Sequence, residues 1–281
     1  MTGVGLSDVH FCRSGVMPAT DGYRDVASTD DSTHIEASPG VVVTREIGGQ
    51  GFRIDEATRR GLLQWMQTAL LSAHHFDDLS GRIEIVEGFL EPIEGFALYW
   101  LARNWRAPGR VVEIGSFKGR STCWLAAACK ERGDGKVTAI DHFRGSPEHG
   151  AGGSHADPDI AAEGSTLPVF CRNLQGVELL DFVEVRVGSC EEVSRSWREP
   201  IRLLFLDADH DGDAVARQVA AWAPFLGRHA LVAFHDVQVW PGVTEVYTRL
   251  RDDTTHWREL AQIKSLGVLE VIADGPGPGS A

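Results

Sequence analysis

The sequence has few cysteines, a shortage of positive charge and no long apolar run. Its five cysteines occur singly and form no C-x-x-C pair, so neither a disulfide framework nor a zinc cluster is predicted. With 27 Lys and Arg against 40 Asp and Glu, the formal net charge of −13 argues against binding to nucleic acid or to an anionic membrane. No run of about 18 apolar residues occurs, and no basic segment leads into an apolar one near residue 1. We therefore expect a cytoplasmic protein that acts on a small, uncharged or cationic partner.

Both ends of the chain are poor in periodic apolar residues. Residues 1–50 are rich in Gly, Ser, Thr and Asp, which predicts a flexible N-terminal segment, and residues 275–281 predict a flexible tail. Apolar residues recur at helical spacing over 55–75 and 91–104, so we expect residues 51–105 to form a helical extension. Such an extension would serve as a lid or as a contact in a homo-oligomer.

Residues 106–274 alternate short apolar runs with helical windows. Because parallel strands are joined by helical crossovers, this alternation predicts a doubly wound α/β domain. The last two apolar runs are too close together for an intervening helix, so a terminal antiparallel hairpin completes a seven-stranded, mostly parallel sheet. The predicted strands are 111–114, 137–140, 182–187, 203–206, 230–234, 259–263 and 268–272, and the predicted helices are 120–132, 159–175, 190–198, 211–225 and 242–252.

A glycine turn follows the first predicted strand, in the segment E-I-G-S-F-K-G-R-S-T at 113–122. Open α/β sheets bind ligands at this edge. The spacing of Gly115 and Gly119 fits neither a dinucleotide fingerprint nor a phosphate loop, and Glu113 favours a ligand with an amine or a sulfonium group. Asp141 ends the next strand, where a carboxylate can accept hydrogen bonds from a ribose diol. These residues predict a nucleoside site, although the turn could simply close a βα unit.

A second group of polar residues follows the fourth and fifth predicted strands. Asp207 ends one strand, and His235 and Asp236 end the next. Since neighbouring strands lie about 5 Å apart, these three side chains could converge on a divalent ion such as Mg²⁺ or Mn²⁺. His210 follows Asp207 by three residues, where an imidazole could remove a proton from a substrate hydroxyl.

The E-x-G-x-x-x-G-x-S pattern, the acidic end of the second strand and the terminal hairpin resemble class I S-adenosylmethionine (SAM)-dependent methyltransferases over about residues 85–273. The resemblance implies that SAM is the methyl donor. It also implies ribose contacts at Asp141 and adenine contacts near Ser189. The turn residues that it assigns to the donor are Glu113, Gly115, Ser116, Gly119 and Ser121.

Within that class, the layout resembles metal-dependent O-methyltransferases of small molecules, of the catechol and sugar types. The resemblance implies that Asp207 and Asp236 bind the ion and that His210 is the catalytic base. His235 departs from the pattern, because those relatives have an acidic residue there. The implied activity is methylation of a hydroxyl on a small-molecule acceptor, a natural-product sugar or a phenol. The alternatives are a metal-independent methyltransferase, a nicotinamide-dependent oxidoreductase and a non-catalytic nucleoside-binding protein.

Overall fold

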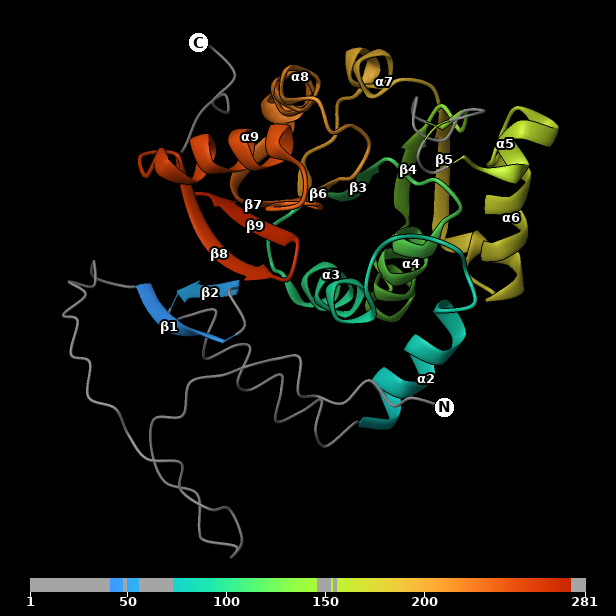
Figure 1. Ribbon diagram of the computed structural model, residues 1–281, viewed down its shortest axis with the longest axis horizontal. Coiled ribbons are helices and arrows are strands. Elements are labelled where there is room, and N and C mark those ends of the chain that lie inside the picture. The colour runs from blue at the N-terminus through green and yellow to red at the C-terminus, as the bar shows by residue number, and fades with distance from the viewer. Residues whose placement is uncertain (1–40, 48–49, 56–72, 146–152, 154–155, 274–281) are drawn as a thin grey trace, which may run out of the picture.

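The computed structural model describes residues 41–47, 50–55, 73–145, 153 and 156–273 (Figure 1). Its main element is a seven-stranded sheet in the order β5-β4-β3-β6-β7-β9-β8. Helices cover both faces of this sheet, and Figure 1 shows α7, α8 and α9 on one side with α3 and α4 on the other. The predicted doubly wound α/β architecture is confirmed.

Six strands of the sheet run parallel, and one opposes them. The opposing strand is β9, which lies between β7 and β8 and forms the predicted terminal hairpin with β8. The helix-linked strands are β3 (Arg110–Ile114), β4 (Val137–Asp141), β5 (Val183–Val187), β6 (Ile201–Leu206) and β7 (Leu226–Phe234), and the hairpin strands are β8 (Trp257–Ile263) and β9 (Leu266–Val271).

The central strands are apolar throughout because both of their faces are buried. Successive residues of a strand point to opposite faces, so Leu203 and Phe205 join one core while Leu204 and Leu206 join the other. The first core lies under α2 (Ala73–Ile83), α3 (Pro92–Asn104), α4 (Arg120–Arg132) and α6 (Leu167–Gly176), and the second lies under α7 (Cys190–Ser196), α8 (Gly212–Trp222) and α9 (Pro241–Asp252).

The N-terminal part differs from the prediction of a flexible segment followed by helices. An antiparallel hairpin is formed by β1 (Val41–Ile47) and β2 (Gln50–Asp55). β1 is rich in β-branched residues, and these favour an extended strand. Outside the described residues lie most of the predicted helix 55–75, residues 1–40 of the predicted flexible segment 1–50, and the whole predicted tail 275–281.

The predicted helix over 159–175 is divided into two. The short α5 (Pro158–Glu163) ends at Gly164, which has a φ of +69° and caps the helix, and α6 begins three residues later. The backbone N–H of Thr166 then donates to the carbonyl of Phe143, which ties this break to the end of β4. Among the described residues, none of the helices has the length and apolar content needed to cross a membrane.

Candidate active site

The candidate site lies where the connections of the sheet change direction. From β3 the chain proceeds outward through β4 to β5, whereas β6 and β7 continue on the opposite side of β3. Ligands bind in such a crevice, at the carboxyl ends of the strands. Gly115 brings the two sides into contact, because a Cβ at this position would lie 2.2 Å from the carbonyl oxygen of Asp207 and its φ is +88°. Only glycine permits this approach.

Two pockets open at this crevice. The Asp141 pocket is lined by residues from the ends of β3, β4 and β5, including Asp141, Gly188 and Ser189. The histidine pocket is lined by the glycine turn, the loop before α3 and the ends of β6 and β7. The two pockets share four lining residues, which are Gly115, Phe117, Asp207 and Ala208.

Asp141, which the sequence predicts to contact the ribose, also holds the glycine turn in place. One carboxylate oxygen of Asp141 accepts from the backbone N–H groups of Ser116 (2.8 Å) and Phe117 (2.9 Å), and the other accepts from Phe143 (2.6 Å). Ser189 is the N-cap of α7, and its hydroxyl accepts from the N–H of Glu192. Both predicted contacts therefore lie in the wall of the pocket.

Glu113 lies beneath the turn and lines neither pocket. The side chain is fully buried, and one of its oxygens accepts from the hydroxyls of Ser116 (2.8 Å) and Thr122 (2.5 Å). Its second oxygen is buried without a hydrogen-bond partner. Burial raises the pKa of Glu113 to about 7, although the neighbouring hydroxyls act to lower it. The sequence prediction of a donor contact is therefore modified, since Glu113 supports the turn from below.

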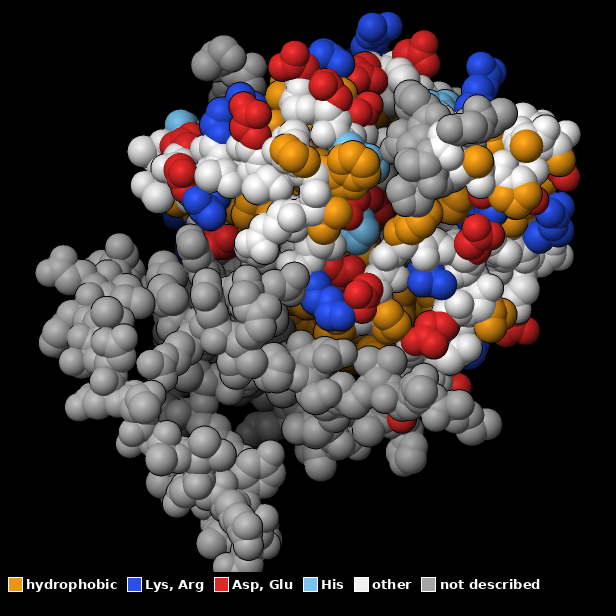
Figure 2. Space-filling view, in the orientation of Figure 1, with side chains coloured by type: hydrophobic (Ala, Val, Ile, Leu, Met, Phe, Trp, Pro, Cys, Tyr) orange, Lys and Arg blue, Asp and Glu red, His pale blue; other side chains and the backbone are white. Residues whose placement is uncertain are grey.

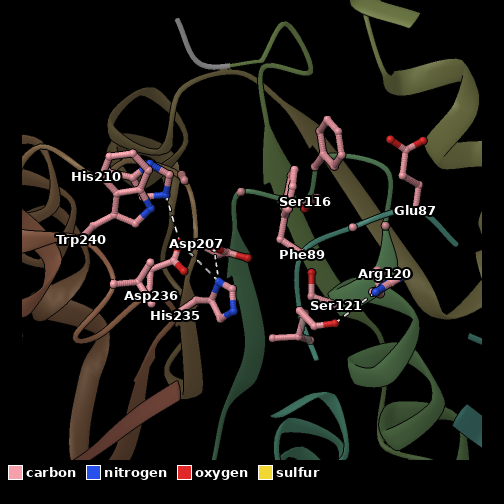
Figure 3. A pocket seen from close by; sticks show the side chains of 17 residues that line it. Glu87, Phe89, Ser116, Arg120, Ser121, Asp207, His210, His235, Asp236 and Trp240 are labelled. Carbon is pink, nitrogen blue, oxygen red and sulfur yellow. Dashed lines mark hydrogen bonds and ion pairs between the residues drawn. The ribbon is translucent and has the colours of Figure 1, made fainter. Parts of the chain in front are cut away.

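The other predicted donor residues of the turn, Ser116, Gly119 and Ser121, line the histidine pocket together with the predicted catalytic and metal-binding residues. Figure 3 shows the two groups on opposite sides: Ser116, Ser121 and Arg120 face Asp207, His235, Asp236 and His210. The histidine pocket thus brings together residues that sequence reasoning selected after three different strands, β3, β6 and β7.

The predicted metal ligands form a compact cluster. The Nδ1 atom of His235 lies 3.0 Å from Oδ1 of Asp207 and 3.5 Å from Oδ2 of Asp236. On the other side of the ring, Nε2 lies 3.4 Å from Oε2 of Glu94. We call these four side chains the His235 cluster. Burial by itself would lower the pKa of His235, but the surrounding carboxylates raise it well above its usual range.

Glu94 is the member of this cluster that sequence reasoning missed. It lies in the first turn of α3, far from the other members in the sequence, and its side chain is 1% exposed. Burial acts to raise the pKa of Glu94, but the contact with His235 and other hydrogen bonds lower it overall. The capping pattern of the helix is visible in the sequence, but nothing there indicates that Glu94 reaches His235.

The cluster can accommodate a divalent cation. Asp207, His235 and Asp236 each offer a ligand atom, and these atoms all lie within 4.8 Å of one another. The three carboxylates around one imidazole carry more negative charge than that ring can offset. Two oxygens and one nitrogen suit Mn²⁺ better than Mg²⁺, which prefers oxygen ligands alone.

His210 is held between an acid and an aromatic ring. Its Nε2 lies 3.1 Å from Oδ2 of Asp236, and its imidazole stacks on Trp240 with ring centroids 4.4 Å apart and an angle of 1°. Across the pocket, Phe89 is 62% exposed and stacks on Phe117. Figure 2 shows histidine and acidic side chains in a hollow that hydrophobic side chains flank. An acceptor in this pocket would thus meet apolar walls and an imidazole–carboxylate pair.

A second ionic cluster anchors the glycine turn to its surroundings. Lys118 is 0% exposed, and its Nζ lies 2.8 Å from Glu87, 2.7 Å from Asp157 and 2.7 Å from Asp159. We call this group the Lys118 cluster. Burial would lower the pKa of Lys118, but the three carboxylates raise it well above its usual range. The cluster ties the start of α5 and the loop before α3 to the turn.

Arg120, the first residue of α4, holds the same loop before α3. Its guanidinium donates to the carbonyl oxygens of Val86 (2.6 Å), Leu90 (3.3 Å) and Glu84 (3.2 Å). This loop carries Phe89 into the wall of the histidine pocket. Two basic residues of the turn, whose roles the sequence pattern did not indicate, therefore hold the loop that lines the histidine pocket.

The strand order, with its terminal antiparallel hairpin, fits the Rossmann-like fold of methyltransferases. Residues 112–237, from β3 to just beyond β7, match the model of a family described as a methyltransferase domain. These residues are therefore similar to a methyltransferase domain, which bears out the resemblance inferred from the glycine turn and the strand ends.

Solved structures share this fold. The chain is similar to the O-methyltransferase NovP, with 16% identity and a TM-score of 0.51, covering 63% of this chain and 78% of NovP. A protein from Corynebacterium glutamicum has 13% identity and a TM-score of 0.51, covering 76% of this chain and 99% of that one. The O-methyltransferase TomG from Streptomyces achromogenes, solved with SAM, has 17% identity and a TM-score of 0.48, covering 71% and 89%.

Proposed function

We propose that the protein transfers the methyl group of SAM to a hydroxyl oxygen of a small molecule, a natural-product sugar or a phenol. The observation that carries this proposal is the junction of the two pockets at Gly115, Phe117, Asp207 and Ala208. A donor in the Asp141 pocket and an acceptor in the histidine pocket would meet there. The solved O-methyltransferase NovP, which shares the fold, supports the reaction class.

The Asp141 pocket has the chemistry that the donor requires. Oδ2 of Asp141 already accepts two backbone N–H groups, whereas Oδ1 accepts one and keeps a site for a ribose hydroxyl. Glu113 places a buried carboxyl group directly under the turn, with an oxygen that lacks a partner. The pKa of this group is about 7, and its ionised form favours the positively charged sulfonium and ammonium groups of SAM over a phosphate.

The protein's main contribution to the reaction is alignment. In an in-line displacement the acceptor oxygen bonds to the methyl carbon as the carbon–sulfur bond breaks, and the hydroxyl proton must be removed. His210 lies in the acceptor pocket and takes this proton. Asp236, 3.1 Å from its Nε2, stabilises the positive charge that the ring then acquires.

A divalent ion bound by Asp207, His235 and Asp236 would supply a Lewis acid that makes the acceptor hydroxyl more acidic. The chain itself provides the ligands and keeps them in place, because Gly115 packs directly on the backbone of Asp207. The donor set supports Mn²⁺ as the ion.

A second candidate is metal-independent methyl transfer. It is favoured by the position of His235, whose two ring nitrogens both face carboxylates that raise its pKa and so favour the cationic form of the ring. In that case His235 would offset the charge of Asp207 and Asp236 without an ion. A transfer rate that is insensitive to EDTA would select this candidate.

Calorimetric titration with S-adenosylhomocysteine, with NAD as the control ligand, tests the proposal first. We expect binding of the homocysteine nucleoside and none of NAD. Phenols and nucleotide sugars are then screened for methyl transfer from SAM, once with Mn²⁺ and once with EDTA. Failure of the homocysteine nucleoside to bind would overturn the proposed donor, and binding of NAD in its place would favour an oxidoreductase.

A further inference from the structure

Glu94 is a buried carboxylate whose position the reaction described above does not explain. One oxygen, Oε1, accepts from the backbone N–H (2.8 Å) and the hydroxyl (2.7 Å) of Ser265, in the turn between β8 and β9. The other, Oε2, accepts from the N–H of Glu91 (3.0 Å). A buried charge is costly unless it is hydrogen-bonded, and these donors fix the carboxylate in one orientation.

The oxygen that bonds to Glu91 also faces His235. It lies 3.4 Å from Nε2, and the imidazole side chain is only 4% exposed. The opposite nitrogen, Nδ1, lies between Asp207 and Asp236. A flip of the ring would replace both nitrogens by carbon atoms at these contacts. Glu94 thus selects the ring orientation in which Nδ1 is directed toward the two aspartates.

The same contact joins three separate parts of the chain. Ser265 holds Glu94 through its N–H and hydroxyl, and its carbonyl oxygen accepts from the N–H of Val237, which directly follows Asp236. The start of α3, the β8–β9 turn and the end of β7 are therefore fixed relative to one another at this point. Since α3 lies outside residues 112–237, the site depends on a helix beyond the matched domain.

We propose that Glu94 is a positioning residue of a divalent-metal site: it accepts a hydrogen bond from Nε2–H of His235 and thereby presents Nδ1, beside Asp207 and Asp236, as a metal ligand. This inference rests on the metal site of the proposed function. A carboxylate that holds the outer N–H of a metal-binding histidine fixes the tautomer and the direction of the ring. Loss of such a partner typically weakens metal binding by about 10- to 100-fold.

The test is titration of the full chain with Mn²⁺, for the wild type, Glu94→Gln and Glu91→Gln. Glu91→Gln is the matched control, because it makes the same substitution at the exposed residue that precedes α3. We expect Glu94→Gln to weaken Mn²⁺ binding by about 10- to 100-fold, Glu91→Gln to leave it unchanged, and both variants to bind S-adenosylhomocysteine as the wild type does. Pulsed EPR should show coupling of Mn²⁺ to a ring nitrogen in the wild type, and this coupling should weaken in Glu94→Gln.

The outcomes separate this inference from the function on which it rests. Equal Mn²⁺ affinity in the wild type and Glu94→Gln, or Mn²⁺ bound without nitrogen coupling, would overturn the role of Glu94 and leave SAM-dependent transfer intact. Absence of Mn²⁺ binding in a wild type that binds S-adenosylhomocysteine would overturn the metal site and this inference together. If Glu94→Gln does not fold, Ser265→Ala removes only one hydrogen bond to Oε1, and a reduced Mn²⁺ affinity is expected there as well.

Discussion

The Lys118 cluster and the His235 cluster have the same composition, since each consists of three carboxylates around one basic side chain. They differ in how well the base satisfies the acids. The ammonium group of Lys118 contacts all three carboxylates at 2.7 to 2.8 Å, whereas the two nitrogens of His235 lie 3.0 to 3.5 Å from theirs. The flexible lysine side chain has three N–H donors, one for each carboxylate. The planar imidazole has at most two, so it cannot donate to all three. The first cluster therefore holds the structure together, while the second keeps capacity for a ligand.

The largest effect should come from His210, which lies beside the His235 cluster. His210→Ala should lower kcat by about 100- to 10,000-fold, because it removes the base that we propose for the acceptor hydroxyl. Affinity for S-adenosylhomocysteine should not change, since the Asp141 pocket does not include His210. Methyl transfer and calorimetry measure the two quantities. His256→Ala, outside both pockets, serves as the control, and an unchanged kcat in His210→Ala would remove the residue from the mechanism.

Removal of the base from the Lys118 cluster should chiefly reduce stability. Lys118→Met leaves Asp157 buried without its cation, and we expect the free energy of unfolding to fall by about 3 kcal/mol. The matched control is Lys264→Met, because Lys264 pairs with the exposed Glu91, and such pairs contribute less than about 1 kcal/mol. Urea denaturation of both variants gives the comparison. Equal losses would show that the two lysines are energetically alike.

The raised pKa of Glu113 predicts a dependence of stability on pH. Between the unfolded pKa, near 4.3, and the folded value of about 7, the unfolded chain releases a proton that the folded chain retains, so stability falls as pH rises through this window. Below this pH window the ionisation of Glu113 does not change the free energy of unfolding. Above the window the full loss of stability is present. Glu113→Gln lacks this fall, so its stability relative to the wild type should rise by roughly 3 kcal/mol from pH 4 to pH 8. Unfolding curves at several pH values measure it, with the exposed Glu245→Gln as control; a difference that does not vary with pH would contradict the raised pKa.

The smallest effect concerns the choice of metal. His235→Asp replaces the ring nitrogen by oxygen, which Mg²⁺ prefers, so affinity for Mg²⁺ relative to Mn²⁺ should increase by about tenfold. Titrations with each ion, with S-adenosylhomocysteine binding as a check on folding, measure this ratio. An unchanged ratio would indicate that His235 is not a ligand and that the two clusters are both purely structural.

The sheet and much of the candidate site could be predicted from the sequence, for reasons that the structure makes plain. A strand that is buried on both faces has a short apolar run as its sequence. In the parallel strands this run ends at the edge of the sheet where the two pockets lie. Asp141, Asp207 and His235 could therefore be found by their positions at the ends of such runs. The division of α5 from α6 could not, because the helical pattern continues across Gly164.

The contacts made by Glu94 and Lys118 also could not be predicted from the sequence. Each depends on how a helix or loop from another part of the chain packs on the sheet, and the local pattern around either residue is that of an ordinary helix start or turn. Charged residues are usually solvated, so burial of these two could be recognised only from the packed structure. The strand-end residues line the candidate site, and tertiary packing places Glu94 beside one of them, His235.

The stacking of His210 on Trp240 also gives the protein an optical signal. An indole in parallel contact with an imidazole, at 4.4 Å between centroids, experiences a cation–π interaction whenever that imidazole carries a proton. Its emission will therefore differ between the two charge states of the ring. Trp240, one of eight tryptophans in the chain, is thus an intrinsic fluorophore placed against the proposed base, and its share of the emission depends on whether that ring carries a proton.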